Sequence, residues 1–196
     1  QATALQHGFP DVRSEARRRP RHIRTSRGAG ALAAIRLARV SMITRKRDVA
    51  GFQFADPGDV FLVDDGRGLA FAMMGMTPAR RATLPATYTA LTLKNGVPIG
   101  YIQIELLGRH GALSFNTFEA FRGAEAAQVF ARFIAASFHL FGCTSFSVEP
   151  YQLGLGNDEG IESGAWWFYQ RMGFRPLTGQ ARRLAARELS RRRANP

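Results

Sequence analysis

The sequence predicts an α/β fold of the mixed α+β kind: a mostly antiparallel central sheet with one β-α-β unit and flanking helices. Two segments, 59–75 and 88–107, each contain two strand-like runs separated by a turn signal. A third observation is a change of period. After a further strand at 111–118, apolar residues recur at helical spacing over 124–141, and a short apolar strand follows at 143–150. A strand, a helix and a strand in this order form a β-α-β unit, and joined to antiparallel hairpins they make a mixed sheet.

The N-terminal part of the chain is basic. Residues 1–28 include RRRPRHIRTSRG, which is polar, rich in arginine and broken by proline, and they predict a basic, flexible arm. Residues 29–47 predict an amphipathic helix with a basic face. The residues with helical spacing are Leu32, Ile35, Arg36, Arg39, Val40 and Ile43.

The hairpins are predicted by their turns. Asp65-Gly66 joins two short strands in 59–75, and Asn95-Gly96 joins the longer pair in 88–107. Both dipeptides accept the positive φ angles that a two-residue hairpin turn requires.

The long helix is predicted by an i, i+3, i+4 stripe that implies one buried face. Its apolar members are Ala127, Phe130, Phe133, Ile134, Phe138 and Phe141. Gly142 is placed to end this helix, and Pro150 is placed to stop the strand that follows.

The last quarter of the chain predicts smaller elements. Residues 151–162 predict an irregular loop, 163–172 a short helix that ends at Gly173, and 174–177 a last strand. Residues 180–194 predict a basic, Arg-Ala-rich helix. The predicted organisation is therefore an arm at 1–28, a single domain at 29–178 and a C-terminal basic helix at 179–196.

The net charge of +12 is unevenly distributed. Residues 1–47 carry +10, residues 171–196 carry +7, and residues 48–170 carry −5. Arg-rich flanks of this kind bind nucleic acid phosphates without sequence preference. The alternative is a compositional bias, because nearly all the basic residues are arginine. The sequence leaves both interpretations open.

Several classes of protein are excluded or disfavoured. The only cysteine, Cys143, excludes a disulfide within the chain, and with four scattered histidines it offers no zinc site, so we expect no metal. No apolar run is long enough to span a membrane. The expected location is the cytoplasm, with no membrane partner.

The stretch from Ala165 to Phe174, AWWFYQRMGF, resembles the last conserved motif of the GNAT superfamily of acyl-CoA-dependent N-acetyltransferases. In that family a helix ends in Phe-Tyr, two or three further residues, and Gly-Phe. The resemblance covers about residues 88–176. It implies that Tyr169 faces the sulfur of the cofactor and that Phe168 and Phe174 pack in the core. The alternative is that all these aromatic residues, Tyr169 included, belong to the core.

The resemblance also implies a pyrophosphate-binding loop between the strand at 111–118 and the long helix. The family pattern is Arg or Gln, two residues, Gly, one residue, and Gly or Ala, and here the loop reads RGAEAA after Phe121. Backbone N–H groups at a helix N-terminus bind phosphates, and small residues allow close approach. The cofactor-binding residues implied in this way are Phe118, Arg122, Gly123, Ala124, Ala126, Ala127 and Tyr169. Glu125 stands where the family has Gly, and its carboxylate is expected to repel a pyrophosphate.

The activity implied by the resemblance is transfer of an acetyl or similar acyl group from a CoA thioester to a small-molecule or peptide amine. Tyr169 is the expected proton donor to the leaving thiolate. Glu119 and Glu149, each near a strand end, are the expected candidates for the base that deprotonates the amine. Glu162 stands where the family often has Asn, which is a second departure.

Two other functions remain open at this stage. In the first, the chain is a catalytically inactive GNAT-fold domain with a binding or regulatory role in a larger protein. In the second, it is a nucleic-acid-associated protein that contacts phosphates through its Arg-rich flanks.

Overall fold

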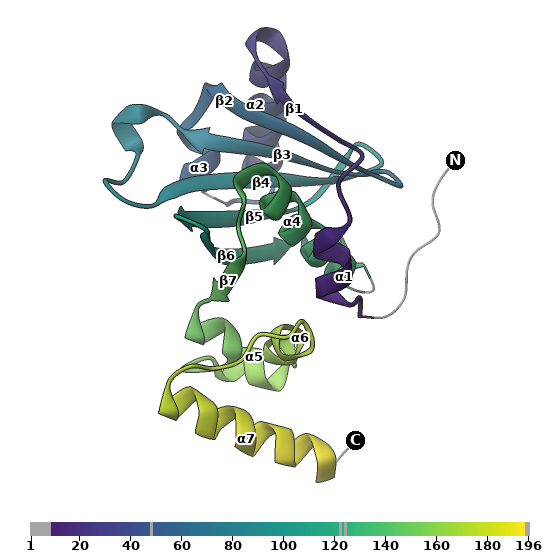
Figure 1. The fold of residues 1–196 in the computed structure, drawn as a ribbon, viewed down its shortest axis with the longest axis vertical. Helices are drawn as coiled ribbons and strands as arrows, with labels where there is room; N and C mark the ends of the chain where they lie inside the picture. Colours follow the sequence, from purple (N-terminus) through teal and green to yellow (C-terminus); the bar gives the residue numbers. More distant parts are fainter. Residues whose placement is uncertain (1–8, 48, 122, 124, 195–196) are drawn as a thin grey trace.

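The computed structural model describes residues 9–47, 49–121, 123 and 125–194 of the chain. It is an α+β structure with a seven-stranded open sheet, and the strands lie in the sheet in the same order as in the sequence (Figure 1). The strands are β1 (His22–Ser26), β2 (Ala55–Gly66), β3 (Leu69–Met76), β4 (Ala86–Lys94), β5 (Val97–Leu107), β6 (His110–Thr117) and β7 (Ser145–Val148). The prediction of a mostly antiparallel mixed sheet is confirmed.

Only the last pair of strands in the described sheet is parallel. β6 and β7 pair from His110 opposite Ser145 to Leu113 opposite Val148, and the first six strands pair antiparallel. Helix α4 (Ala126–Phe141) connects β6 to β7, so the predicted β-α-β unit is confirmed. At the end of α4, Gly142 adopts a left-handed conformation with φ of 71° and donates its N–H to the carbonyl of Phe138.

The two faces of the sheet are covered by different helices. Helix α4 lies on one face, where Phe130 and Phe133 are fully buried with Phe71, Ile102 and Ile104 of the sheet. Helices α2 (Gly28–Ile43) and α3 (Ala50–Gln53) cover the opposite face (Figure 1). The buried residues of α2 are Ala31, Ile35, Ala38, Ser41 and Met42. The helix predicted from Ala29 to Arg47 is therefore present, but several of its aliphatic residues lie outside the core.

The N-terminal segment corrects the prediction of a flexible arm over 1–28. Residues 1–8 lie outside the described residues, but Val12–Arg17 form helix α1 and His22–Ser26 form an edge strand paired with β2. Helix α1 packs on α4, and Phe9 and Val12 contact the core. The physical reason is the fully buried Arg132 of α4, whose guanidinium donates to the backbone carbonyls of Glu15 and Arg18. The folded domain thus includes residues 9–28.

Turn positions and short elements also differ from the sequence prediction. The first hairpin turns at Gly66, Arg67 and Gly68, which all have positive φ, rather than at Asp65-Gly66. The second turns at Asn95 and Gly96, as predicted, with φ of 51° and 79°. Residues 174–177 form no strand, so β7 is an edge strand. The segment predicted as an irregular loop carries two short helices, the 3-10 helix η3 (Pro150–Leu153) and α5 (Asp158–Glu162).

The C-terminal helices lie beyond β7. Helix α6 (Ala165–Arg171) packs on η3, and α7 (Gly179–Ala194) follows at the end of the molecule farthest from α2 (Figure 1). The predicted basic C-terminal helix is confirmed. None of the helices in the described ranges is long and apolar enough to cross a membrane.

Candidate functional site

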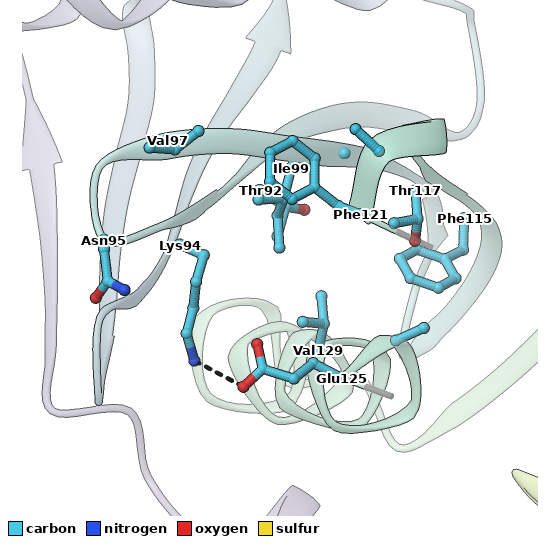
Figure 2. Close-up of a pocket in the computed structure, with 13 residues that line it drawn as sticks. Thr92, Lys94, Asn95, Val97, Ile99, Phe115, Thr117, Phe121, Glu125 and Val129 are labelled. Atoms are coloured by element: carbon cyan, nitrogen blue, oxygen red, sulfur yellow. Dashed lines mark hydrogen bonds and ion pairs between the residues drawn. The ribbon is translucent and has the colours of Figure 1, made fainter. Parts of the chain in front are cut away.

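A crevice of about 450 Å³ opens at the N-terminal end of α4, between this helix and the sheet (Figure 2). Its walls are the β4–β5 turn, the end of β6, the 3-10 helix η2 (Glu119–Phe121) and the first turn of α4. We call it the α4 crevice. It forms here because β6 ends at Thr117 and the chain must pass through η2 before it enters α4, so the helix begins away from the sheet.

The walls of the α4 crevice are mostly apolar. Ile99 lies on the sheet side and Val129 on the helix side (Figure 2). The ring of Phe115 lies toward the β6 end, and the ring of Phe121 points from η2 toward Ile99 and Thr92. Ligand sites of this size are commonly apolar with a few polar groups that fix orientation. The crevice therefore provides contact area for an apolar ligand group.

Thr92 provides a polar group in this apolar surface. Its side chain is 1% exposed and lines the α4 crevice, and its hydroxyl has no hydrogen-bond partner within the described residues. A buried hydroxyl without a partner destabilises a fold by about 1–3 kcal/mol. A ligand whose donor or acceptor reaches the Thr92 oxygen would recover this loss, so Thr92 is a candidate ligand-binding residue of the crevice.

An ion pair closes the other end of the crevice. The Nζ of Lys94 donates to Oε1 of Glu125 at 3.0 Å, and each of these side chains is less than one-fifth exposed (Figure 2). Glu125 occupies the N-cap position of α4 but makes no side-chain cap hydrogen bond. Because Lys94 neutralises this carboxylate, the repulsion of a pyrophosphate that the sequence predicts is much reduced. The partial positive charge at the N-terminus of a sixteen-residue helix remains.

The expected cofactor-binding residues are only partly brought together. Ala126 lines the α4 crevice, and Gly123, with φ of 141°, lies just before the helix. Ala127, in the first turn of α4, is buried in the core between this helix and the sheet. Phe118 lies on the opposite face of the sheet, where it packs against Tyr101 and beneath the guanidinium of Arg45. Arg122 and Ala124 lie outside the described residues.

Tyr169 is placed in the core rather than in the crevice. It is 8% exposed, and its ring packs edge-on against Phe130, Phe168 and Phe174. Burial raises the pKa of its phenol, so Tyr169 stays protonated at neutral pH. Phe168 stacks on Phe115, whose ring also lines the α4 crevice. These two phenylalanines thus connect the motif helix α6 to the crevice.

The two expected bases lie in separate places. Glu119 is exposed on η2, beside crevice residues Ala120 and Phe121 but not itself in the lining. Glu149 is exposed at the end of β7, on a groove of about 760 Å³ between β7 and residues 172–178. The structure therefore does not gather Tyr169, Glu119 and Glu149 into one catalytic centre.

Thr92 and Lys94 are the site residues that the sequence did not indicate. Both lie in β4, whereas Glu125 is 31 positions away from Lys94 in the chain. Only the folded sheet places the end of β4 next to the start of α4. The one available signal is that Lys94 and Lys46 are the only lysines in an arginine-rich chain.

Two other charged clusters support the fold. Arg132 is fully buried and pairs with Asp65 through Nε and Nη2, at distances from 2.6 to 2.9 Å. Burial raises the pKa of Asp65, and the hydrogen bonds and charge of Arg132 oppose this effect. In the second cluster, the Tyr88 hydroxyl lies 2.9 and 3.0 Å from the carboxylate oxygens of Asp59. Within the described ranges, no group of three His, Cys, Asp or Glu side chains is arranged to hold a metal ion.

The chain was compared with known proteins. Models of protein families, curated protein sequences and solved structures each give no match to this chain.

Proposed function

We propose that the protein binds acetyl-CoA, or another acyl-CoA, in the α4 crevice and transfers the acyl group to an amine. The phosphates would lie at the N-terminus of α4, and the pantetheine arm or acyl group would contact the apolar walls. The proposal joins the motif resemblance in α6 to a cavity at the end of the helix where the resemblance expects the phosphates.

The observation that carries this proposal is the Thr92 hydroxyl. It is buried, lacks a hydrogen-bond partner within the described residues and lines a cavity at a helix N-terminus. The amide and carbonyl groups of a pantetheine arm are hydrogen-bonding groups on an otherwise apolar chain. They match the Thr92 hydroxyl, which lies among apolar residues such as Ile99 and Val129. Thr117 supplies a second hydroxyl in the same lining.

The roles of the surrounding residues follow from their charges. The first-turn N–H groups of α4 favour an anion. Lys94 holds the Glu125 carboxylate at 3.0 Å and so prevents it from repelling that anion. In the transfer, the amine nitrogen forms a bond to the acyl carbon, the carbon–sulfur bond breaks, the amine loses a proton and the thiolate gains one. Glu119, exposed beside the crevice, is the nearest of the expected bases.

A second candidate function is acyl-CoA binding without catalysis. It is favoured by one observation: Tyr169, the expected proton donor to sulfur, is enclosed by Phe130, Phe168 and Phe174 and does not line the crevice.

Calorimetric titration with acetyl-CoA tests the binding step. Dephospho-CoA is the second ligand, and moderate salt suppresses general binding of polyanions to a protein of charge +12. Thr92→Val removes the hydroxyl at nearly constant volume and is expected to weaken binding about 5- to 10-fold, the value of one hydrogen bond. Thr89→Val is the matched control. Thr89 is equally buried in β4 with an unpartnered hydroxyl, but it faces α3 on the other side of the sheet.

The outcomes separate the candidates. Saturable binding that Thr92→Val weakens and Thr89→Val does not would support a site in the α4 crevice. Release of free CoA upon addition of spermidine or a lysine-containing peptide would then support transfer, and Tyr169→Phe would measure the role of the phenol. Binding without release favours the second candidate. No binding of either ligand would overturn both.

A further inference from the structure

The outer face of α2 exposes aliphatic side chains that the sheet does not cover. Leu32, Leu37, Val40 and Ile43 have relative exposures of 55%, 40%, 51% and 73%. Exposed aliphatic residues are unremarkable when they are scattered, but these four lie within twelve positions of one helix. On the inner face, Ile35 and Met42 are buried against the sheet. α2 is therefore apolar on both sides although only one side is packed.

The same region carries positive charge without any acidic residue. Residues 16–47 contain ten arginines and one lysine and no Asp or Glu. Arg36 and Arg39 are exposed among the aliphatic residues of α2, and Arg24 and Arg27 lie just before the helix. Arg39 donates to the backbone carbonyls of Phe52 and Gln53 rather than to a carboxylate. The positive charge of this face is thus not neutralised by neighbouring side chains within the described ranges.

The combination of exposed aliphatic groups and cations favours an anionic partner that also has an apolar part. Nucleic acid phosphates attract the cations but give Leu32, Val40 and Ile43 nothing apolar to contact. An anionic lipid bilayer offers both, because its headgroups carry the negative charge and its acyl chains begin a few ångströms below. A helix on the outside of a sheet can lie parallel to a flat bilayer surface, with its outward side chains entering the interface.

We propose that the outer face of α2 docks the protein peripherally on a membrane that contains anionic phospholipids. Leu32, Val40 and Ile43 enter the boundary between headgroups and acyl chains, and Arg36, Arg39 and Lys46 contact the lipid phosphates. The sequence predicts no membrane partner only because it lacks a spanning segment, and peripheral docking does not need one. The inference is independent of the proposed acyltransferase activity, since α2 and α4 lie on opposite faces of the sheet (Figure 1).

Vesicle co-sedimentation of the full chain tests the proposal. The two probes are vesicles of phosphatidylcholine alone and vesicles of phosphatidylcholine with 30% phosphatidylglycerol, at about 0.1 M salt. We expect binding to the second and little to the first, because each cation near an anionic surface contributes about 1 kcal/mol. The triple variant Leu32→Gln/Val40→Gln/Ile43→Gln keeps the charge and the helix propensity. It is expected to bind the anionic vesicles at least about tenfold more weakly.

The matched control lies at the far end of the molecule. Leu177 is 82% exposed, and Arg191 and Arg193 are exposed on α7. The variant Leu177→Gln/Arg191→Gln/Arg193→Gln loses one aliphatic residue and two charges there, and it is expected to bind nearly as well as the parent chain. All changed residues are exposed, and circular dichroism verifies that each variant is folded.

Three results would overturn the proposal. The first is that the parent chain does not bind anionic vesicles. The second is equal weakening by the α2 and α7 variants, which would mean that binding does not depend on the α2 face in particular. The third is binding unchanged by the aliphatic triple variant, or displaced completely by duplex DNA, which would identify the surface as an electrostatic nucleic acid site.

Discussion

At the scale of single residues, Arg132 is the position where the burial found in the structure differs most from the burial expected from the sequence. The spacing of apolar residues in 124–141 places it on the polar side of α4, yet it is fully buried. The reason is tertiary, because α1 covers that side of the helix and supplies acceptors from Glu15 and Arg18. Burial alone would raise the pKa of Glu15. The hydrogen bond and charge of Arg18, together with the charge of Arg132, outweigh this effect and lower the pKa of Glu15.

Replacing Arg132 is therefore expected to destabilise the protein strongly. Arg132→Met fills a similar volume but leaves the buried Asp65 with only its longer ion pair to Arg18, at 3.8 Å, and the expected loss is about 3–5 kcal/mol of unfolding free energy. Urea denaturation measures it. The double variant Arg132→Met/Asp65→Leu removes the poorly paired carboxylate and should recover part of the loss. A single variant as stable as the parent chain would contradict the role assigned to this pair.

Tyr88 predicts a pH dependence at the alkaline end. Burial, together with the hydrogen bond to Asp59 and its negative charge, raises the pKa of Tyr88 from 10.0 to about 12. Above pH 10 the unfolded chain loses this proton and the folded chain does not. The contribution of the Tyr88 proton to the unfolding free energy is therefore fully present below pH 10 and is lost progressively toward pH 12. Urea midpoints at pH 8.5, 10 and 11 should fall less steeply in Tyr88→Phe than in the parent chain, with Tyr151→Phe as an exposed control.

At the scale of elements, local patterns predicted most of the structure. The hairpin at Asn95-Gly96, the period of α4 and its end at Gly142 all depend on neighbours within a few positions, and all are confirmed. Residues 174–177 show the limit of this approach. They begin and end on apolar residues, as a short strand can, but Pro176 has no backbone N–H to donate. No backbone hydrogen bond joins them to β7 among the described residues.

The end of α4 gives a test that isolates backbone conformation. Gly142 has φ of 71°, and a Cβ built there would meet no heavy atom within 4 Å. Gly142→Ala is therefore expected to cost about 1 kcal/mol through the left-handed conformation alone. Gly179→Ala, at the first position of α7, has no positive φ and only an ordinary contact with Arg183, so it should be neutral or slightly stabilising. Thermal unfolding of both variants measures the difference.

At the scale of the whole molecule, the sequence could not predict which distant segments meet. The family resemblance of α6 and of the loop before α4 rests on residues that are close together in the chain. The contact between Lys94 and Glu125 and the position of Thr92 in the wall of a crevice arise only when β4 and α4 come together. For the same reason Tyr169 could not be assigned from its motif to a cofactor wall or to the core.

The N-terminal segment supplies a test at this scale. A flexible arm could be removed without effect, whereas the structure has α1 covering Arg132. Deleting residues 1–21 is therefore expected to lower Tm by more than Glu15→Gln, which removes one charge and leaves the backbone acceptors in place. Equal stability of the deleted and full chains would show that α1 does not contribute to the fold.

The order of the strands has a consequence for how the chain folds. From β2 to β6, strands that are neighbours in the sheet are also neighbours in the chain, and the longest connection between them is the segment 77–85 between β3 and β4. These contacts are therefore local in sequence and form quickly. The hydrogen bonds of Arg132 to Glu15 and Arg18 join residues 117 and 114 positions apart. We therefore expect a fast phase that builds the central meander and a slower one in which α1 docks on α4. Until that docking is complete, the Arg132 guanidinium stays hydrated. Its charge must lose this water before α1 can pack on α4, so the same group that later holds α1 in place slows the docking step.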